Sequence, residues 1–506
     1  MTGKTRYKVK DALVDTPLGY EAFNVSTSAT EITVNSMTNK AVIKLLPFQI
    51  DFHHDGVHSV TVNGKSLLRF EHLRPKPEIP DPNEEPGSWE EIFMEIVDTK
   101  PRGPEAVAVD FLFPQSEVLF GIPEHADDFA LRKTTGDEPY RLYTLDVTFY
   151  ELDSRMPTYG AVPVIYGHGP KQTVGVFWHN SADTFIDVHD NQTSHFISEA
   201  GVIDFFVMLG PKPDMVFSQY TKLTGVAKVP QLFTLAYHQS RWNYLTQEEV
   251  AEVVDNFDKN DLQLDTMWLD IEYTDGKRYF TWNLTAFPDP IGMMTNLTAT
   301  GRHLTYIVDP HIKTDVGYRF YSENKARGFF VKDKNGVLDY EGSCWPGMSS
   351  YVDYFNPAAR KFYADQYLLE NFQLNAVDTG IWNDMNEPTV FDVPEKTISK
   401  DSIHYEGWEH RNLHSMYALM QVKGTHDGIM RRASNQLRPF ILTRAFFSGV
   451  QRYSAIWTGD NGAEWGYLQA SIKMCLSISV LGKKLLNITK VHEVPITIFR
   501  NFILRQ

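Results

Sequence analysis

Residues 375–388 read NAVDTGIWNDMNEP, and this stretch decides how the second half of the chain is expected to fold. Its apolar centre is short enough for one buried strand, and it ends in acidic residues at Asp384 and Glu387. A helical pattern, AARKFYADQYLLENF, precedes it at residues 358–372. A helix followed by a short buried strand is the repeating unit of an α/β fold.

The same unit recurs along the chain after Pro230. Apolar strands are predicted within six segments: FTLAYHQ (233–239), TMWLDIEY (266–273), HLTYIVDPH (303–311), NAVDTGIWNDMN (375–386), RPFILTRAF (438–446) and YSAIWTGDN (453–461). Helical patterns are predicted at residues 245–260, 358–372, 410–430 and 467–480. This alternation indicates a (β/α) barrel with about six of its eight strands.

The first 225 residues or so predict a β-sandwich. Residues 41–70 alternate apolar and polar side chains, and Asn63-Gly64 within them predicts a two-residue hairpin turn. Residues 72–91 are rich in proline and acidic side chains, which predicts a solvated loop. The predicted domains are a β-sandwich at residues 1–228, a barrel at 229–480 and a divergent tail at 481–506.

Composition excludes several classes of function. A formal charge of -16 argues against nucleic-acid binding, because the phosphate backbone requires clustered cations. Two cysteines, Cys344 and Cys475, give neither a disulfide framework nor a zinc spacing. No run approaches the roughly 20 apolar residues of a membrane span, and no signal peptide is recognised. Glycosylation sequons lie at Asn24, Asn191, Asn283, Asn296 and Asn487.

Polar side chains follow every predicted barrel strand. They are His238, Asp270, Asp309, His311, Asp384, Arg444 and Asp460. In this fold the carboxyl ends of the strands build the active site. Asp384 and Glu387 are too close in sequence to flank one substrate bond from both sides, so Asp460 is the best second acid. Two carboxylates facing across a barrel mouth are what glycoside hydrolysis requires.

The chain also resembles glycoside hydrolase family 31. The motifs that carry the resemblance appear in order: FGIPEHADDFALR (120–132), PQLFTLAYHQSRWNY (230–244), WLDIEY (268–273), WNDMNEP (382–388), ILTRAFFSG (441–449) and IWTGDN (456–461). The resemblance implies a galactose-mutarotase-like β-sandwich followed by an incomplete (β/α)8 TIM barrel. It also implies a retaining exo-α-glucosidase that removes terminal α-linked glucose, most plausibly from N-glycans, without metal or cofactor.

The resemblance assigns residue roles by motif. It implies that Asp384 is the nucleophile, that Asp460 is the general acid/base and that Glu387 orients its neighbours without reacting. For a retaining enzyme the two reacting carboxyls are expected about 5–5.5 Å apart. The residues expected to bind substrate are Asp270, Trp345, Arg444, Asp127 and Trp382.

The members that the chain resembles most act in the lumen of the endoplasmic reticulum with a beta subunit, so both are expected by resemblance. Relative to the family pattern the chain looks truncated at both ends, and Leu481 to Gln506 departs from it. One alternative is therefore a catalytically impaired, carbohydrate-binding remnant. An α-xylosidase is another alternative. Space in the pocket for the C6 hydroxymethyl group of the sugar would distinguish an α-glucosidase from an α-xylosidase.

Overall fold

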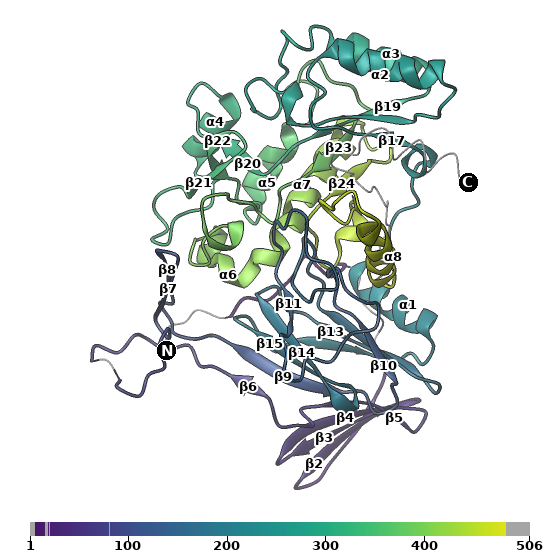
Figure 1. Ribbon diagram of the computed structural model, residues 1–506. Helices are drawn as coiled ribbons and strands as arrows, with labels where there is room; N and C mark the ends of the chain where they lie inside the picture. The colour runs from purple at the N-terminus through teal and green to yellow at the C-terminus, as the bar shows by residue number, and fades with distance from the viewer. Residues whose placement is uncertain (1–5, 16–18, 20, 80, 482–506) are drawn as a thin grey trace.

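The computed structural model describes residues 6–15, 19, 21–79 and 81–481. Figure 1 shows antiparallel β structure in the lower half and mixed α/β structure in the upper half. The sequon at Asn487 and all but the first residue of the predicted tail lie outside the described residues. Both predicted classes of structure are therefore present, in the predicted order along the chain.

The lower half holds two antiparallel sheets. The larger has its strands in the order β1 (Asn24–Thr27), β2 (Glu31–Ser36), β3 (Asn39–Leu45), β4 (Phe48–His54), β5 (Val57–Val62), β9 (Val107–Leu112), β15 (Thr193–Ser198), β14 (Thr184–His189) and β11 (Tyr140–Leu142), and β6 (Arg69–Phe70) also pairs with β9. The smaller has the order β10 (Val118–Gly121), β12 (Val164–His168), β13 (Thr173–Trp178) and β16 (Phe205–Met208).

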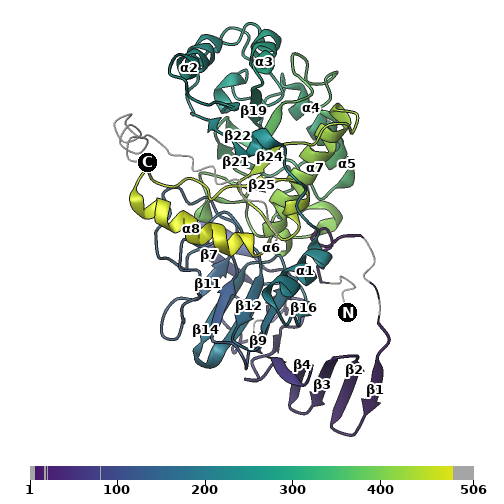
Figure 2. The same ribbon diagram turned by 90° about the vertical axis from the view of Figure 1, so that its right-hand side faces the viewer.

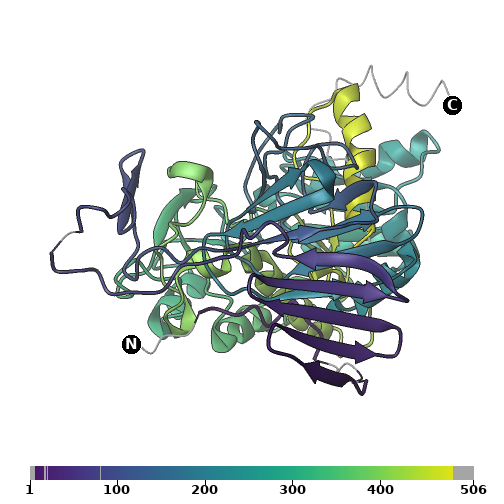
Figure 3. The same cartoon turned by 90° about the horizontal axis from the view of Figure 1, so that it is seen from below.

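A buried apolar cluster joins these two sheets. Alternate residues of β9 and β13, including Val109, Phe111 and Trp178, contribute side chains to it. Phe111 meets Trp178 edge-on, with the ring centroids 6.3 Å apart. Two sheets that share one core in this way form the predicted β-sandwich. Figure 3 shows strands β1 to β4 as the edge of the larger sheet.

The predicted hairpin at Asn63-Gly64 is wrong. Strands β5 and β6 on either side of it do not pair with each other, because both pair with β9. The Asp110 carboxylate accepts hydrogen bonds from the backbone N–H groups of Lys65 and Leu67, and this holds the chain along β9. The tight turns of this region lie instead at residues 46–47 and 55–56, between the paired strands β3, β4 and β5.

The upper half contains one parallel sheet with its strands in chain order. They are β17 (His238–Gln239), β18 (Thr266–Leu269), β19 (His303–Ile307), β23 (Gly380–Asn383), β24 (Ile441–Thr443) and β25 (Ala455–Ile456). The helices in the described part of the chain are α1 (Pro213–Thr224), α2 (Gln247–Lys259), α3 (Pro290–Ala299), α4 (Arg319–Arg327), α5 (Pro357–Asp365), α6 (His410–Leu413), α7 (Tyr417–Arg432) and α8 (Trp465–Ser479). Six parallel strands with helical connections confirm the predicted α/β class.

The helix starts follow local sequence signals. Thr246 and Glu249 form a capping box at the start of α2, in which each side chain binds the other residue's backbone N–H. Asp289 and Asn356 cap α3 and α5, and each is followed by a proline in the first turn. The predicted helix at 358–372 ends early, at Asp365, and continues as irregular turns.

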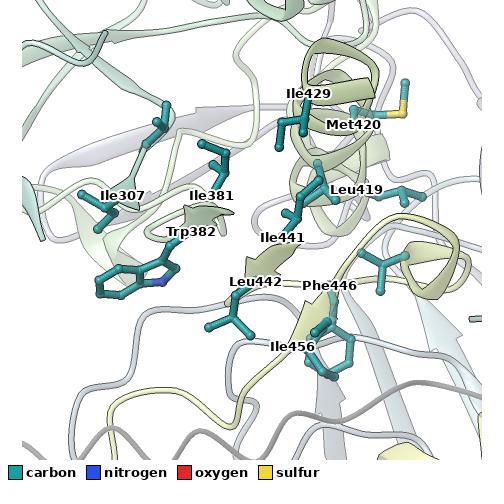
Figure 4. Packing of buried hydrophobic residues seen from close by; sticks show 14 of the residues in the cluster. Ile307, Ile381, Trp382, Leu419, Met420, Ile429, Ile441, Leu442, Phe446 and Ile456 are labelled. Carbon is teal, nitrogen blue, oxygen red and sulfur yellow. The ribbon is translucent and has the colours of Figure 1, made fainter. Parts of the chain in front are cut away.

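Figure 4 shows how the strands pack against a helix. Ile381 from β23 and Ile441 from β24 point toward Leu419 of α7, whereas Trp382 and Leu442 point to the opposite face of the same strands. All five of these side chains are buried. Strands with apolar residues on both faces are typical of parallel sheets, which explains the continuous apolar runs in the sequence.

Smaller elements complete the chain. An antiparallel sheet has the order β20 (His311–Lys313), β22 (Gly347–Tyr351) and β21 (Glu341–Cys344), and a hairpin joins β7 (Glu90–Phe93) to β8 (Ile96–Thr99) after the predicted solvated loop. Among the described residues, the 3₁₀ turns are η1 (Asp190–Gln192), η2 (Leu232–Leu235), η3 (Ile271–Tyr273), η4 (Pro394–Lys396), η5 (Tyr405–Gly407), η6 (His414–Met416) and η7 (Val450–Arg452).

The two halves are in direct contact. The backbone N–H of Ala161 donates to the carbonyl of Phe446, 2.9 Å away, and Gly160 forms a parallel bridge with Phe446. A Cβ at Gly160 would lie 2.1 Å from the Phe446 ring, so only glycine permits this approach. Helix α8 lies beside the sandwich in Figure 2 and contacts β10. The sandwich thus reaches the carboxyl ends of the parallel strands.

Candidate active site

Arg444 lies at the centre of the site and joins acids from two strands. It follows β24, and its side chain is 1% exposed. Its Nε lies 3.1 Å from Oδ1 of Asp384, which follows β23, and its Nη1 donates to Oδ2 of Asp460 at 3.0 Å. Burial by itself lowers the pKa of Arg444, but Asp384 and Glu387 raise it well above its usual value. The guanidinium therefore stays charged and lies close to both carboxylates.

Glu387 binds Arg444 more fully than the other acids do. Its two carboxylate oxygens accept hydrogen bonds from Nε and Nη2 of Arg444, at 2.8 and 2.9 Å. The Thr389 hydroxyl also donates to Glu387, at 2.6 Å. Glu387 is fully buried, at 0% exposure. With both oxygens engaged, this residue is placed to orient Arg444, and its role as a group that does not react stays a prediction.

The β-sandwich fixes the position of Asp460. The Asp460 backbone N–H donates to the Tyr159 hydroxyl at 3.2 Å, and the Phe149 N–H donates to the Asp460 carbonyl at 2.9 Å. The Tyr159 ring also packs against the Arg444 guanidinium, 4.7 Å from its centroid. Two residues of the sandwich therefore hold the backbone of a residue that belongs to the barrel, and sequence periodicity gave no indication of this.

A further acid in the site comes from the sandwich. Oδ1 of Asp146 lies 3.6 Å from Nη2 of Arg444. Burial raises the pKa of Asp146, and the neighbouring Glu387 and Asp460 raise it further, while Arg444 opposes the rise. The sequence analysis missed Asp146. Only its position in the segment that leads to the interface, at residues 144–161, could have suggested it.

Asp270 and Asp309 extend the acidic cluster around Asp384. Oδ1 of Asp270 accepts the N–H of Ile271 and caps η3. Burial raises the pKa of Asp309 well above its usual value, and the charges of Asp384 and Asp270 raise it further. The Tyr279 hydroxyl donates to Asp309 at 2.5 Å, which opposes that rise. Strand ends β18, β19 and β23 thus converge, as predicted.

The two predicted tryptophans occupy different environments. Trp382 is 2% exposed and lies inside the sheet, edge-on to Trp268 and Trp457 at centroid distances of 5.6 and 5.7 Å. Trp345 is only half-buried and packs against Trp242 and Phe391, which are themselves exposed. Partly exposed aromatic surfaces are where sugar rings stack. Contact of either tryptophan with a sugar stays a prediction.

Asp127 lies in the sandwich with its carboxylate engaged locally. It accepts hydrogen bonds from Nε of Arg132 at 3.0 Å and from the Tyr140 hydroxyl at 2.8 Å. The adjacent Ala126 belongs to the same buried apolar cluster as Tyr159, which places the loop near the site. Its predicted role as a substrate ligand is untested by these contacts and stays a prediction.

Cys344 is a buried neutral thiol beside the acidic cluster. Burial raises its pKa well above the usual value, and the charges of Asp309 and Asp146 add to the rise. A thiol in this state is a poor nucleophile. Within the described part of the chain, no group of three or more His, Cys, Asp or Glu side chains is placed to hold a metal ion. Nor does any described helix have the length and apolar character needed to cross a bilayer.

The geometry agrees with comparisons to known families. Residues 227–487 match the glycosyl hydrolases family 31 TIM-barrel domain, and residues 2–187 match the glycosyl hydrolase 31 N-terminal galactose mutarotase-like domain. The chain therefore belongs to glycoside hydrolase family 31. This confirms the predicted family and both predicted architectures.

Individual relatives fall in one part of that family. The chain is 43% identical to neutral alpha-glucosidase AB of Mus musculus over 95% of its length and 56% of the relative's. It is 40% identical to glucosidase 2 subunit alpha of Schizosaccharomyces pombe over 92% of its length and 52% of the relative's. The chain thus spans about half the length of the curated relatives it matches.

Solved structures give the same result. A crystal structure of the ER glucosidase II heterodimeric complex, which holds the catalytic subunit and the binding domain of the regulatory subunit, matches with a TM-score of 0.89 and 42% identity. The match covers 94% of this chain and 55% of that one. A glucosidase II alpha subunit with alpha3-Glc2 bound matches with a TM-score of 0.90 over 94% of this chain and 54% of that one.

Proposed function

We propose that this chain is the catalytic part of a retaining exo-α-glucosidase, in which Asp384 is the nucleophile and Asp460 the general acid/base. The observation that carries the proposal is the Arg444 guanidinium, within 3.1 Å of both carboxylates, which come from the ends of different strands. Both acids are almost fully buried, at 6% and 8% exposure, so a sugar bound there would be shielded from water.

The reaction proceeds by two displacements. The Asp384 carboxylate attacks the anomeric carbon while the protonated Asp460 gives its proton to the leaving glycosidic oxygen. The Asp460 carboxylate then takes a proton from water, which attacks the same carbon and releases Asp384. Arg444 stabilises the negative charge on both residues, and Asp270, which follows β18 and is 8% exposed, is placed to accept hydrogen bonds from sugar hydroxyls.

The substrate and setting are proposed from the relatives. Glucosidase II alpha subunits have been solved with alpha3-Glc2 and with Glc1Man2 bound. We therefore propose terminal α-linked glucose on N-glycans as the substrate and the lumen of the endoplasmic reticulum as the compartment. The complex with a regulatory subunit supports a beta subunit as the partner.

A second candidate is a carbohydrate-binding chain without turnover. Among the described residues, β17 and β25 each pair with one neighbour only, so the parallel sheet has two open ends. An open sheet holds its mouth less rigidly than a closed barrel does. This candidate predicts sugar binding in the absence of hydrolysis.

Hydrolysis of a chromogenic α-glucoside tests the proposal. The purified chain is expected to release the chromophore and to form α-glucose first, as proton NMR of the product can show. Asp460→Asn is expected to lower kcat by about 10²–10⁴-fold. Binding of an iminosugar with no product would favour the second candidate, and β-glucose as first product would exclude a retaining mechanism.

A further inference from the structure

Three buried histidines form a continuous hydrogen-bonded chain next to the site. His404 Nε2 lies 2.9 Å from His410 Nδ1, and His410 Nε2 lies 2.7 Å from His414 Nδ1. Their exposures are 3%, 0% and 0%. The His414 ring stacks on Tyr143 with centroids 3.8 Å apart, so it is fixed in place. The proposed hydrolysis makes no direct use of any of them.

One end of this chain reaches Glu387, and the other end is a carboxylate. His404 Nδ1 lies 2.9 Å from Oδ1 of Asp353. At the far end, His414 Nε2 lies 2.8 Å from the Thr144 carbonyl and 2.9 Å from the Thr144 hydroxyl. That hydroxyl donates to the Glu387 carbonyl at 3.1 Å. The histidines therefore connect Asp353 to the loop that carries Glu387.

When all three imidazole rings are neutral, the hydrogen-bonded histidines carry one proton fewer than their links require. There are four links: Asp353 to His404, His404 to His410, His410 to His414, and His414 to Thr144. Both outer groups, a carboxylate and a carbonyl, can only accept. Each link requires one proton, whereas a neutral imidazole carries one, so three rings fill three links. A fourth proton is therefore required if all four links are to be filled while the Thr144 hydroxyl donates to Glu387.

We propose that His404, His410 and His414 are positioning residues that relay the protonation of the Asp353–His404 pair to Glu387. With an imidazolium at His404, the two other rings carry their protons on Nε2 and the Thr144 hydroxyl donates to the Glu387 carbonyl. The effect of the relay on catalysis rests on the function proposed above, whereas the proton arrangement does not.

Loss of one proton reverses the donor direction of the hydrogen bonds between the histidines. His404, His410 and His414 then each carry the proton on Nδ1, and each donates toward Asp353. The Thr144 hydroxyl must donate to the bare Nε2 of His414, so the Glu387 carbonyl loses its donor. Glu387 holds Arg444 through both carboxylate oxygens, so the change reaches the cation that joins the reacting acids.

The surroundings of His410 and His414 oppose a charge on either ring. Burial lowers the pKa of His410 well below its usual value and that of His414 to about 3. The titratable side chains that face the chain are Lys400, Arg411, Arg141, Asp183, Tyr143 and Tyr417. Lys400 opposes a charge on both His410 and His414. His404 alone has a carboxylate at hydrogen-bond distance, which is the position that stabilises an imidazolium.

Ring-nitrogen NMR of the histidine-labelled chain tests the proton arrangement without reference to activity. His→Gln variants at each of the three positions assign the signals. In the protonated form we expect protons on both nitrogens of His404 and on Nε2 only of His410 and His414. All three rings should change together to Nδ1–H as the pH rises. Nδ1–H on His410 and His414 at every pH, or rings that titrate independently, would overturn the proposal.

Kinetics test the link to catalysis. Asp353→Asn offers an amide N–H to His404, so all links are filled with neutral rings, and the alkaline fall of kcat that the relay causes is expected to disappear. Thr144→Val is expected to lower kcat about tenfold at unchanged KM. Thr134→Val, which removes another buried hydroxyl, is the control.

The NMR and kinetic experiments together distinguish failure of the histidine relay from failure of the proposed function. A chain with the expected ring tautomers but no hydrolysis refutes the proposed function and leaves the relay in place. An Asp353→Asn variant with the alkaline limb of the wild type contradicts the relay even when hydrolysis is normal.

Discussion

Replacing Arg444 by lysine keeps one positive charge but removes the geometry that joins the acid-bearing strands. The guanidinium makes two hydrogen bonds to Glu387, at 2.8 and 2.9 Å, and one to Asp460 at 3.0 Å, and it lies 3.1 Å from Asp384. An ammonium is a single point of charge and cannot bind two carboxylates in parallel. At least two of the charge-assisted hydrogen bonds are therefore lost in Arg444→Lys.

The magnitude follows from those contacts. A hydrogen bond to a charged group contributes about 1.5–3 kcal/mol, and breaking a buried ion pair costs about 3–5 kcal/mol. We expect the free energy of unfolding to fall by about 3–5 kcal/mol in Arg444→Lys. Because the same cation faces both proposed reacting acids, kcat is expected to fall by about 10²–10³-fold, as for loss of one preorganised donor.

The assay combines urea unfolding with hydrolysis of a chromogenic α-glucoside. Arg302→Lys is the matched control, because Arg302 is also buried, at 8% exposure, and its guanidinium binds Asp258 through two nitrogens. Arg302 precedes β19, at the opposite end of the strands from Asp384. The control is expected to lose stability while its kcat stays within about twofold of the wild type.

Two results would refute this reasoning. Wild-type kcat in a folded Arg444→Lys chain would mean that the bridge between Asp384 and Asp460 has no part in catalysis. An equal loss of kcat in Arg302→Lys would mean that activity follows general stability and not the cation in the site.

Three further predictions concern stability and reactivity. Burial lowers the pKa of His311 to about 3, so this ring stays neutral in the folded state, whereas in the unfolded state it binds a proton below about pH 6.5. The folded state therefore loses stability as the pH falls. Between pH 6.5 and 5, urea unfolding should show that the free energy of unfolding falls by about 2 kcal/mol more in the wild type than in His311→Gln. A Cβ at Gly459, which has φ +81°, would lie 1.9 Å from the Tyr159 ring, so Gly459→Ala should cost about 1–3 kcal/mol and lower kcat, and unchanged values for both would contradict the role of Tyr159. Burial raises the pKa of Cys475 to about 11 and that of Cys344 well above its usual range, so iodoacetamide should modify Cys475 slowly and Cys344 only after unfolding, as peptide mass spectrometry can show.

The sequence predicted the architecture because its signals are local. Each parallel strand is a short apolar run that ends in a polar residue, as at residues 266–270 and 380–384, and each predicted helix has its own period, with side-chain caps at the starts of α2 and α5. The hairpin prediction at Asn63-Gly64 failed because Asp110, a residue distant in sequence, binds the backbone after the turn. A turn signal records local preference and does not identify the strand that the chain pairs with next.

Apart from Asp127, the site residues that the sequence predicts all come from the barrel. Asp384, Arg444 and Asp460 follow strands and could be named from the pattern. Asp146 and Tyr159 were missed, because they lie in irregular segments of the sandwich and meet Arg444 roughly 290 residues further along the chain. Local periodicity contains no information about contacts between residues so far apart in sequence, so these contacts could be identified only in the folded structure.

The most direct test of the central claim is to trap the covalent intermediate. A 5-fluoro-α-glucosyl fluoride slows the release of the sugar from the nucleophile more than its attachment, so the glycosyl-enzyme accumulates. Mass spectrometry of the digested chain should then find one fluoroglucosyl group on the peptide that carries Asp384, and none in Asp384→Asn. A label on the peptide that carries Asp460, or turnover of α-glucoside that proceeds without any adduct, would contradict the account.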